Sequence, residues 1–236
     1  MKVFIVHAHH EPTSFNGAMT SAAVQALRAA GHEVVVSDLH AMGFDPVSDR
    51  RNFTTLADPA RLDQQVEEKH ASQIGGFSAD IQAEMDKLLW CDALILQFPL
   101  WWLGPPAILK GWIDRVLALG FAYGGGRWFD GGVFSGKRAM GSVTIGGPEA
   151  AYSGVGVYER PMEEVLHPLL HGTFAFVGFE VVEPFLVHAP QRMSPAEREA
   201  VLADYRGRVL ALDTAPARAR LRSDDYERMV RKAISR

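Results

Sequence analysis

The sequence predicts an α/β domain in which a five-stranded parallel sheet is doubly wound, with helices on both of its faces. Five short, largely apolar runs predict strands, and the first of them, at 3–6, shows no polar alternation, which is typical of a strand buried on both faces. Stretches with helical spacing separate these runs, and strands that alternate with helices form doubly wound sheets. The 236 residues, 47% of them hydrophobic, suffice for one sizeable domain at 1–212, followed by a short Arg-rich tail at 213–236.

The first half of the chain alternates as this fold requires. A strand at 3–6 precedes a helix with regular apolar spacing, which stops at Gly31, where a left-handed cap is expected. A second strand at 34–36 leads into the segment 41–77, which has no clear period and several Gly and Pro residues. We predict a long surface loop there, and such loops commonly carry function.

The second half continues the alternation. Its predicted elements are a helix at 78–90, a strand at 93–98, a helix opening at 105–106 and running through 116, a strand at 139–145, a helix at 162–176 and a strand at 181–187. Ser194, Pro195 and Glu197 form a capping-box pattern that opens a last helix. From Ala217 the tail is rich in Arg, and we expect a solvated, frayed helix there.

Composition excludes several functional classes. The net charge of −4 argues against a nucleic-acid surface, which would require a strong excess of Lys and Arg. The single cysteine, Cys91, rules out an intramolecular disulfide and a Cys-based zinc cluster, so we expect a reducing compartment, the cytoplasm. No apolar stretch of about 18 residues is present, so no membrane span is expected.

In a doubly wound sheet, ligands bind beyond the carboxyl ends of the strands, so the loops after the first, third and fourth strands are the candidates. The first loop leads through Thr13, Ser14 and Asn16 into a helix N-terminus, which favours a phosphate. It lacks the G-x-G-x-x-G pattern of a dinucleotide unit, so a flavin phosphate fits better. The alternative is that these residues only cap the helix.

The same loop holds three histidines in an H-x-H-H run at 7–10. In an extended chain, neighbouring side chains of such a run point to opposite sides, whereas a metal needs convergent ligands. We therefore expect no metal site.

The other two loops offer an aromatic pair and a glycine pair. Trp101 and Trp102 follow the third strand and suggest a platform for a flat ring, or else a contact with a partner subunit. Gly146 and Gly147 follow the fourth strand, where the backbone can approach a ligand closely, and Tyr152 adds a neutral phenolic donor. A simple turn is the alternative reading of the glycine pair.

At these loops the sequence resembles the NAD(P)H:quinone oxidoreductase family, the FAD-containing, DT-diaphorase-like branch of the flavodoxin-like fold. The resemblance runs from the first strand to about Leu212. Its strongest stretches are His9 with 13–16, 97–100 with Trp102 and Gly104, 106–112, 121–123, Gly146-Gly147 with Tyr152-Ser153, and 178–179 with 183–184.

The resemblance implies a homodimer with the active site at the subunit interface. Hydride would pass from NAD(P)H to a flavin and then to a quinone in a ping-pong sequence, with FAD as the flavin and FMN as the alternative. The residues implied for cofactor binding are His9, Ser14, Phe15, Asn16, Pro99, Leu100, Trp101, Trp102, Leu103, Thr144, Ile145, Gly146, Gly147, Tyr152 and Arg198.

The resemblance also implies residues for catalysis and for the acceptor. Tyr152 matches the family's catalytic tyrosine, and Tyr158 aligns with its relay histidine, for which His167 or His171 are alternative candidates. The acceptor side would involve Tyr123, Gly125, Trp128 and Phe176. Two other functions stay open: a one-electron flavodoxin-type carrier, although such carriers are usually strongly acidic, and a regulatory flavoprotein subunit.

Overall fold

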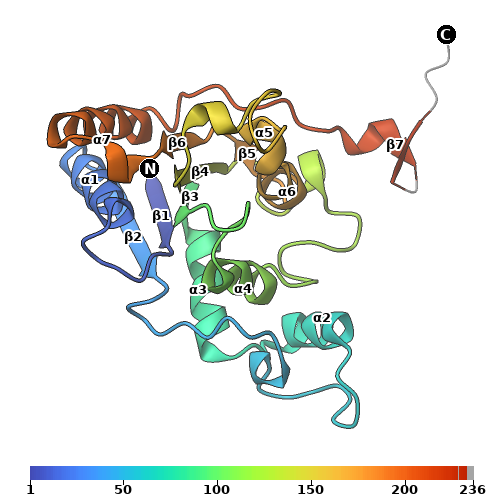
Figure 1. Ribbon diagram of the computed structural model, residues 1–236. Coiled ribbons are helices and arrows are strands. Elements are labelled where there is room, and N and C mark those ends of the chain that lie inside the picture. The colour runs from blue at the N-terminus through green and yellow to red at the C-terminus, as the bar shows by residue number, and fades with distance from the viewer. Residues whose placement is uncertain (228, 233–236) are drawn as a thin grey trace.

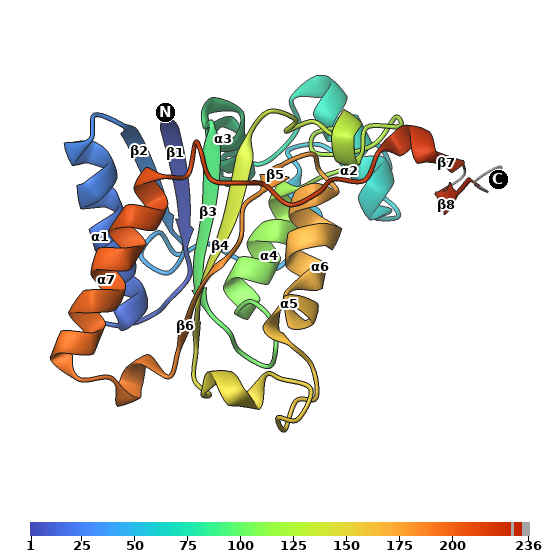
Figure 2. The ribbon, with the colours of Figure 1, turned by 90° about the horizontal axis from the view of Figure 1, so that it is seen from above.

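The computed structural model describes residues 1–227 and 229–232 and contains one open parallel sheet (Figure 1). The strand order is β2-β1-β3-β4-β5, and β6 also pairs with β4. The strands are β1 (Lys2–His7), β2 (Glu33–Asp38), β3 (Ala93–Pro99), β4 (Arg138–Ile145), β5 (Glu180–Val181) and β6 (Phe185–His188). The carboxyl ends of the long strands point to the same edge (Figure 2).

Helices cover both faces of the sheet, as predicted (Figure 2). On one face lie α1 (Phe15–Ala29) and α7 (Pro195–Leu210), and on the other lie α3 (Ala79–Trp90), α4 (Ala107–Val116), α5 (Met162–Val165) and α6 (His167–Leu169). A separate apolar core fills each side, with Tyr205 on α7 and Trp112 on α4 among the largest fully buried side chains. The doubly wound parallel fold is confirmed.

The predicted fifth strand is interrupted, so the sheet has six strands. Its two pieces, β5 and β6, both run parallel to β4. Pro184 lies between them and has no backbone N–H to donate, which breaks the hydrogen-bonded ladder at that point.

The segment 41–77 is not only a surface loop, because it contains α2 (Gln64–Ile74). The Asp63 carboxylate accepts a hydrogen bond from the Val66 N–H and caps its start, and Gly75 ends it in the left-handed conformation (φ 68°). Two of the inward-facing residues are Glu67 and Glu68, and both are buried. Charged residues on the buried face hide the apolar period that would have predicted this helix.

Two further expectations were wrong in detail. The helix predicted at 162–176 is broken into α5, α6 and a π-helical turn at 170–175, with Pro168 inside the interrupted stretch. The tail is extended instead of helical: Ala217 bridges to Val182, and the Arg218 N–H donates to the Val181 carbonyl at 2.8 Å. Its end forms a short hairpin of β7 (Tyr226–Glu227) and β8 (Val230–Arg231), and residues 228 and 233–236 lie outside the described part.

In the described part of the chain, none of the helices combines the length and the apolar character that crossing a bilayer requires.

Candidate active site

A cleft of about 390 Å³ opens at the carboxyl edge of the sheet, where the loops after β1, β3, β4 and β6 meet. It brings together many of the predicted cofactor residues. The lining residues are His9, Thr13, Ser14, Phe15, Asn16, Pro99, Leu100, Trp101, Thr144, Ile145, Gly146, Pro190, Gln191 and Arg198. Trp102, Leu103, Gly147 and Tyr152, which were also predicted to bind the cofactor, lie in the same loops but outside this lining.

The N-terminus of α1 forms the polar end of the cleft. The Ser14 hydroxyl caps the helix by accepting from the Gly17 N–H at 3.1 Å. The first N–H groups of a helix have no intrahelical acceptor, so in the described chain those of Phe15 and Asn16 remain available to a ligand. The positive end of the helix dipole adds to them.

The charge of the lining suits an anion. Arg198 contributes a guanidinium group, and none of the lining residues is an Asp or Glu. The nearby Glu11 carboxylate accepts hydrogen bonds from the Thr13 N–H and hydroxyl at 2.9 and 2.7 Å. These two donors are therefore occupied, whereas the first N–H groups of α1 stay free. This donor set fits the phosphate of a flavin.

His9 adds a neutral donor to the same region. Its Nδ1 accepts from the Glu11 N–H at 3.0 Å, so the ring proton is left on Nε2. Burial, and then the neighbouring His10, lower the pKa of His9, which keeps the ring neutral at neutral pH.

The expectation that neighbouring histidines of the H-x-H-H run point to opposite sides was wrong for His9 and His10. The rings of His9 and His10 stack at 4.8 Å instead of pointing to opposite sides. His7 is buried away from them, and its Nδ1 lies 2.8 Å from the Thr20 hydroxyl. Within residues 1–227 and 229–232, no group of three or more His, Cys, Asp or Glu residues is arranged to hold a metal ion.

The loop after β3 is a tight, strained turn. Trp101 and Gly104 exchange backbone hydrogen bonds at 2.9 and 3.1 Å, and the two residues between them have left-handed backbones, with φ of 50° for Trp102 and 61° for Leu103. The Trp102 side chain is fully exposed, at 102%. The Trp101 ring lines the cleft, whereas Trp102 projects from it.

Relaxing this turn is expected to stabilise the fold. Changing Trp102 to Asn and Leu103 to Gly supplies the residues that a left-handed two-residue turn favours, and it removes little buried surface. We expect the free energy of unfolding in urea to rise by about 1–3 kcal/mol. Trp102→Ala removes the indole but keeps the strain, so it serves as the control, and an equal gain from Ala would show that strain is not the cause.

The loop after β4 carries a stacked tyrosine pair. Tyr152 is 9% exposed, and its ring stacks on Tyr158 at 4.6 Å with an interplanar angle of 18°. Burial, and then the neighbouring Tyr158, raise the pKa of Tyr152 above its ordinary value, so the phenol stays protonated. Tyr152 is therefore a neutral hydrogen-bond donor beside Gly147.

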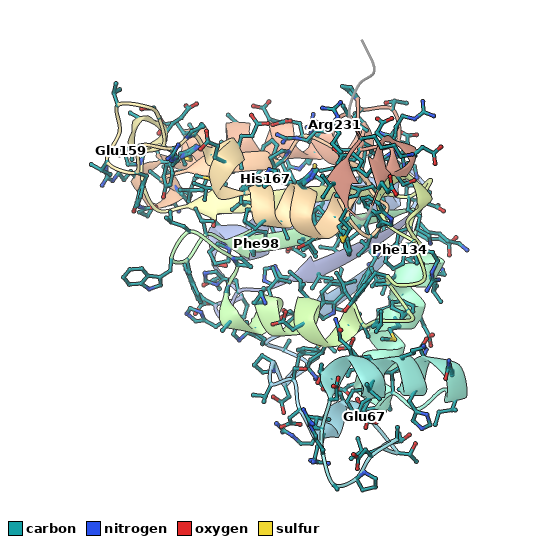
Figure 3. The ribbon with its side chains drawn as sticks, turned by 90° about the vertical axis from the view of Figure 1, so that its right-hand side faces the viewer. Glu67, Phe98, Phe134, Glu159, His167 and Arg231 are labelled. Atoms are coloured by element: carbon teal, nitrogen blue, oxygen red, sulfur yellow. The ribbon has the colours of Figure 1, made fainter. Side chains whose placement is uncertain are left out.

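One histidine that packs against Tyr152 was not among the predicted site residues. His188, the last residue of β6, has its ring 5.9 Å from that of Tyr152, and its Nδ1 is buried without a partner in the described structure. The two predicted alternatives, His167 and His171, stack on each other at 4.8 Å and line a different cavity with Arg218. His167 lies on its helix well away from the loop tip that carries Glu159 (Figure 3).

Gln191 is a second residue that was missed. Its side-chain amide donates to the Gly146 carbonyl at 2.7 Å and so ties the loop after β6 to the loop after β4. The fifth predicted strand ends at the same edge of the sheet as the others, so applying the same rule to its loop would have found both Gln191 and His188.

Three of the residues predicted for the acceptor, Tyr123, Trp128 and Phe176, lie together, and all four lie outside the lining of the cleft. Phe176 packs against Tyr123 at 5.9 Å and reaches Trp128 through Phe129, with ring distances of 5.8 and 5.5 Å. Tyr123 and Phe176 line a cavity of about 230 Å³, whereas Gly125 lines another, of about 400 Å³. Within a single chain, these residues therefore do not line the cleft.

Comparisons with known proteins agree with this fold. A family model described as flavodoxin-like fold matches residues 1–212. NAD(P)H dehydrogenase (quinone) 1 of Cavia porcellus is 44% identical over 209 residues, which is 88% of this chain and 76% of that protein. Ribosyldihydronicotinamide dehydrogenase (quinone) of Homo sapiens is 42% identical over 209 residues, with 88% and 90% covered. A crystal structure from Klebsiella pneumoniae, of a protein assigned as a quinone reductase, is 40% identical with a TM-score of 0.88, covering 92% of this chain and 86% of that one.

Proposed function

The chain belongs to the NAD(P)H:quinone oxidoreductase family of the flavodoxin-like fold, and from that premise we propose that it reduces quinones with NAD(P)H through a bound flavin. The observation that carries the proposal is the single cleft in which the amide-rich start of α1 and Arg198 meet the loops after β3 and β4. A bound flavin supplies a two-electron carrier that accepts hydride from the nucleotide and passes it to the acceptor.

Each part of the cleft has its own task in this proposal. The N–H groups of Phe15 and Asn16 bind the flavin phosphate, and the backbone of 99–103 and 144–147 holds the ring system. Arg198, which lies on α7 and lines the same cleft, supports FAD over FMN because its guanidinium can bind a second phosphate or an adenine. The neutral Tyr152 phenol donates a hydrogen bond where negative charge grows during hydride transfer.

We further propose that a second copy of the chain completes the site, as a homodimer. Tyr123, Trp128 and Phe176 lie outside their own cleft and would close that of the partner. The loops after β3 and β4 are rich in exposed apolar side chains, among them Trp102, Val155 and Val157, which supports a covering partner at this face.

We also propose that the protein works in the cytoplasm, because its single cysteine, Cys91, is a buried free thiol, as expected for a reducing compartment.

Anaerobic titration tests the function. The purified protein should carry a flavin spectrum, lose it on addition of NADH or NADPH, and recover it fully when a simple quinone is added. A flavin that NAD(P)H does not bleach would contradict the proposal. Accumulation of flavin reduced by a single electron would favour a carrier, and reduction without quinone turnover would favour a regulatory subunit.

Replacing Tyr152 with Phe is expected to slow flavin reduction by about 100-fold, the low end for the loss of one donor at a site of developing charge. The flavin content should stay unchanged, because the ring still packs on Tyr158. Stopped-flow absorbance at the flavin band measures the rate. Tyr158→Phe keeps the stack and is the matched control, with a smaller expected effect, whereas an unchanged rate in Tyr152→Phe would remove Tyr152 from the mechanism.

A further inference from the structure

A file of four polar side chains runs between the sheet and the helix layer of α1 and α7 to the cleft. It starts at Tyr205 on α7, continues through Gln97 on β3 and Asn16 on α1, and ends at Thr144 on β4, all on the side of the sheet that α1 and α7 cover. Tyr205 and Gln97 are completely buried, and Asn16 and Thr144 are 3% and 5% exposed. The three hydrogen bonds measure 3.2 Å (Tyr205 to Gln97), 2.8 Å (Gln97 to Asn16) and 2.8 Å (Asn16 to Thr144).

The direction of this file is set at its buried end. The Gln97 Nε2 lies 3.8 Å from the Met19 Sδ, a weak acceptor that favours this orientation of the amide without fixing it. The Gln97 Oε1 then faces the Tyr205 hydroxyl. Burial raises the pKa of Tyr205 far above its ordinary value, so this phenol keeps its proton and donates it to Gln97.

Each later bond follows from the first. Asn16 Oδ1 accepts from Gln97, so Asn16 Nδ2 is the atom that faces Thr144, and it donates to the Thr144 Oγ1. This bond occupies one lone pair of the Thr144 Oγ1. The Thr144 hydroxyl proton takes no part in it and is free to be donated to another acceptor. Asn16 and Thr144 both line the cleft, so this proton can be donated to a bound group.

We propose that Tyr205 is a positioning residue for the flavin site, which it controls by holding Gln97 and Asn16 in the orientation that leaves Thr144 as a hydrogen-bond donor toward the cleft. This inference rests on the proposed function. Without the Tyr205 hydroxyl, the Gln97 amide can turn over and Asn16 with it, and Thr144 would then donate to Asn16 Oδ1 instead. In a buried, low-dielectric file such a reversal changes every bond together.

The expected consequence is a weaker preference for reduced flavin. A donor beside the ring stabilises the more electron-rich, reduced form more than the oxidised form. Losing one neutral donor costs about 1.4 kcal/mol, which is a tenfold change in the ratio of the two affinities. For a two-electron couple, tenfold corresponds to a midpoint potential about 30 mV lower.

Tyr205→Phe tests this in the flavin-loaded protein. The midpoint potential of the flavin, measured by equilibration with reference dyes, should fall by about 30 mV. The midpoint of unfolding is measured as well, to show that the variant is folded. Phe185→Leu is the matched control: Phe185 packs against the Tyr205 ring at 4.9 Å but carries no polar group, so it should leave the potential unchanged. Equal shifts in both variants would show that packing, and not the hydrogen bond, is responsible.

A double-variant cycle checks the route through Thr144. Once Thr144 is replaced by Val, adding Tyr205→Phe should cause no further fall in potential, and an additive fall would overturn the inference. If Tyr205→Phe does not fold, Gln97→Met removes the same relay and should give the same shift. A wild-type protein that binds no flavin would defeat the proposed function, whereas flavin binding with an unshifted potential in Tyr205→Phe would defeat this inference alone.

Discussion

Replacing Gly17 with Ala is expected to weaken flavin binding by at least about 100-fold, which is the loss of two hydrogen bonds to a charged group at about 1.5 kcal/mol or more each. A Cβ at this position of α1 would lie 2.1 Å from the backbone oxygen of Pro12. Backbone cannot swing aside like a side chain, so the loop before α1 must shift. That loop is tied to the start of the helix through the Ser14 N–H, which donates to the Glu11 carbonyl at 3.1 Å, and the shift displaces the N–H groups that would bind the phosphate.

Gly207→Ala is the matched control for this variant. Gly207 lies in α7, and an added Cβ would meet nothing within 4 Å, so it should gain about 0.5–1 kcal/mol of stability and leave flavin affinity unchanged. Quenching of flavin fluorescence gives the affinity, and circular dichroism confirms that Gly17→Ala is folded. A folded Gly17→Ala protein with wild-type affinity would mean that the start of α1 does not hold the phosphate.

The strands of the sheet were predictable because each can be identified from its own short stretch of sequence. Strands such as β3 are buried along their whole length and therefore appear as continuous apolar runs. The helix α2 was not, because Glu67 and Glu68 on its buried face depend on distant partners. Glu67 accepts from the N–H groups of Ala57 and Asp58, and Glu68 accepts from that of Leu119 at 2.7 Å. Nothing in the local pattern predicts that these carboxylates would be buried.

The candidate site was likewise predictable only in part. The three predicted loops meet because parallel strands end at one edge, a rule that needs no side-chain detail. The turn at Trp102 and Leu103 could not be predicted, because left-handed backbone is unfavourable for both residues locally and only the surrounding structure maintains it. Similarly, the sequence places Tyr123 and Phe176 far apart in the chain and contains no information on which cleft they line.

Replacing Arg115 with Met is expected to lower the free energy of unfolding by about 3 kcal/mol, the low end for breaking a buried ion pair, because its partner Asp80 is partly exposed. Arg115 is 4% exposed and joins three segments. It donates to the Asn52 side chain at 2.8 Å, to the Asp45 carbonyl at 2.7 Å and to the Asp80 carboxylate at 2.8 Å. Asn52 is itself buried, so losing the guanidinium leaves its oxygen without a donor.

The local consequence should appear in the segment that Arg115 holds. Limited proteolysis of Arg115→Met should cut between residues 41 and 63 at conditions where the wild type is resistant, because this stretch is tied to α4 and α3 through the guanidinium. Lys110→Ala breaks an exposed ion pair with Asp114 on the same helix and should change stability by no more than about 0.5 kcal/mol. If the two variants lose the same stability in urea, apolar packing around Phe44 and Phe53, and not the buried charge, holds this segment to the domain.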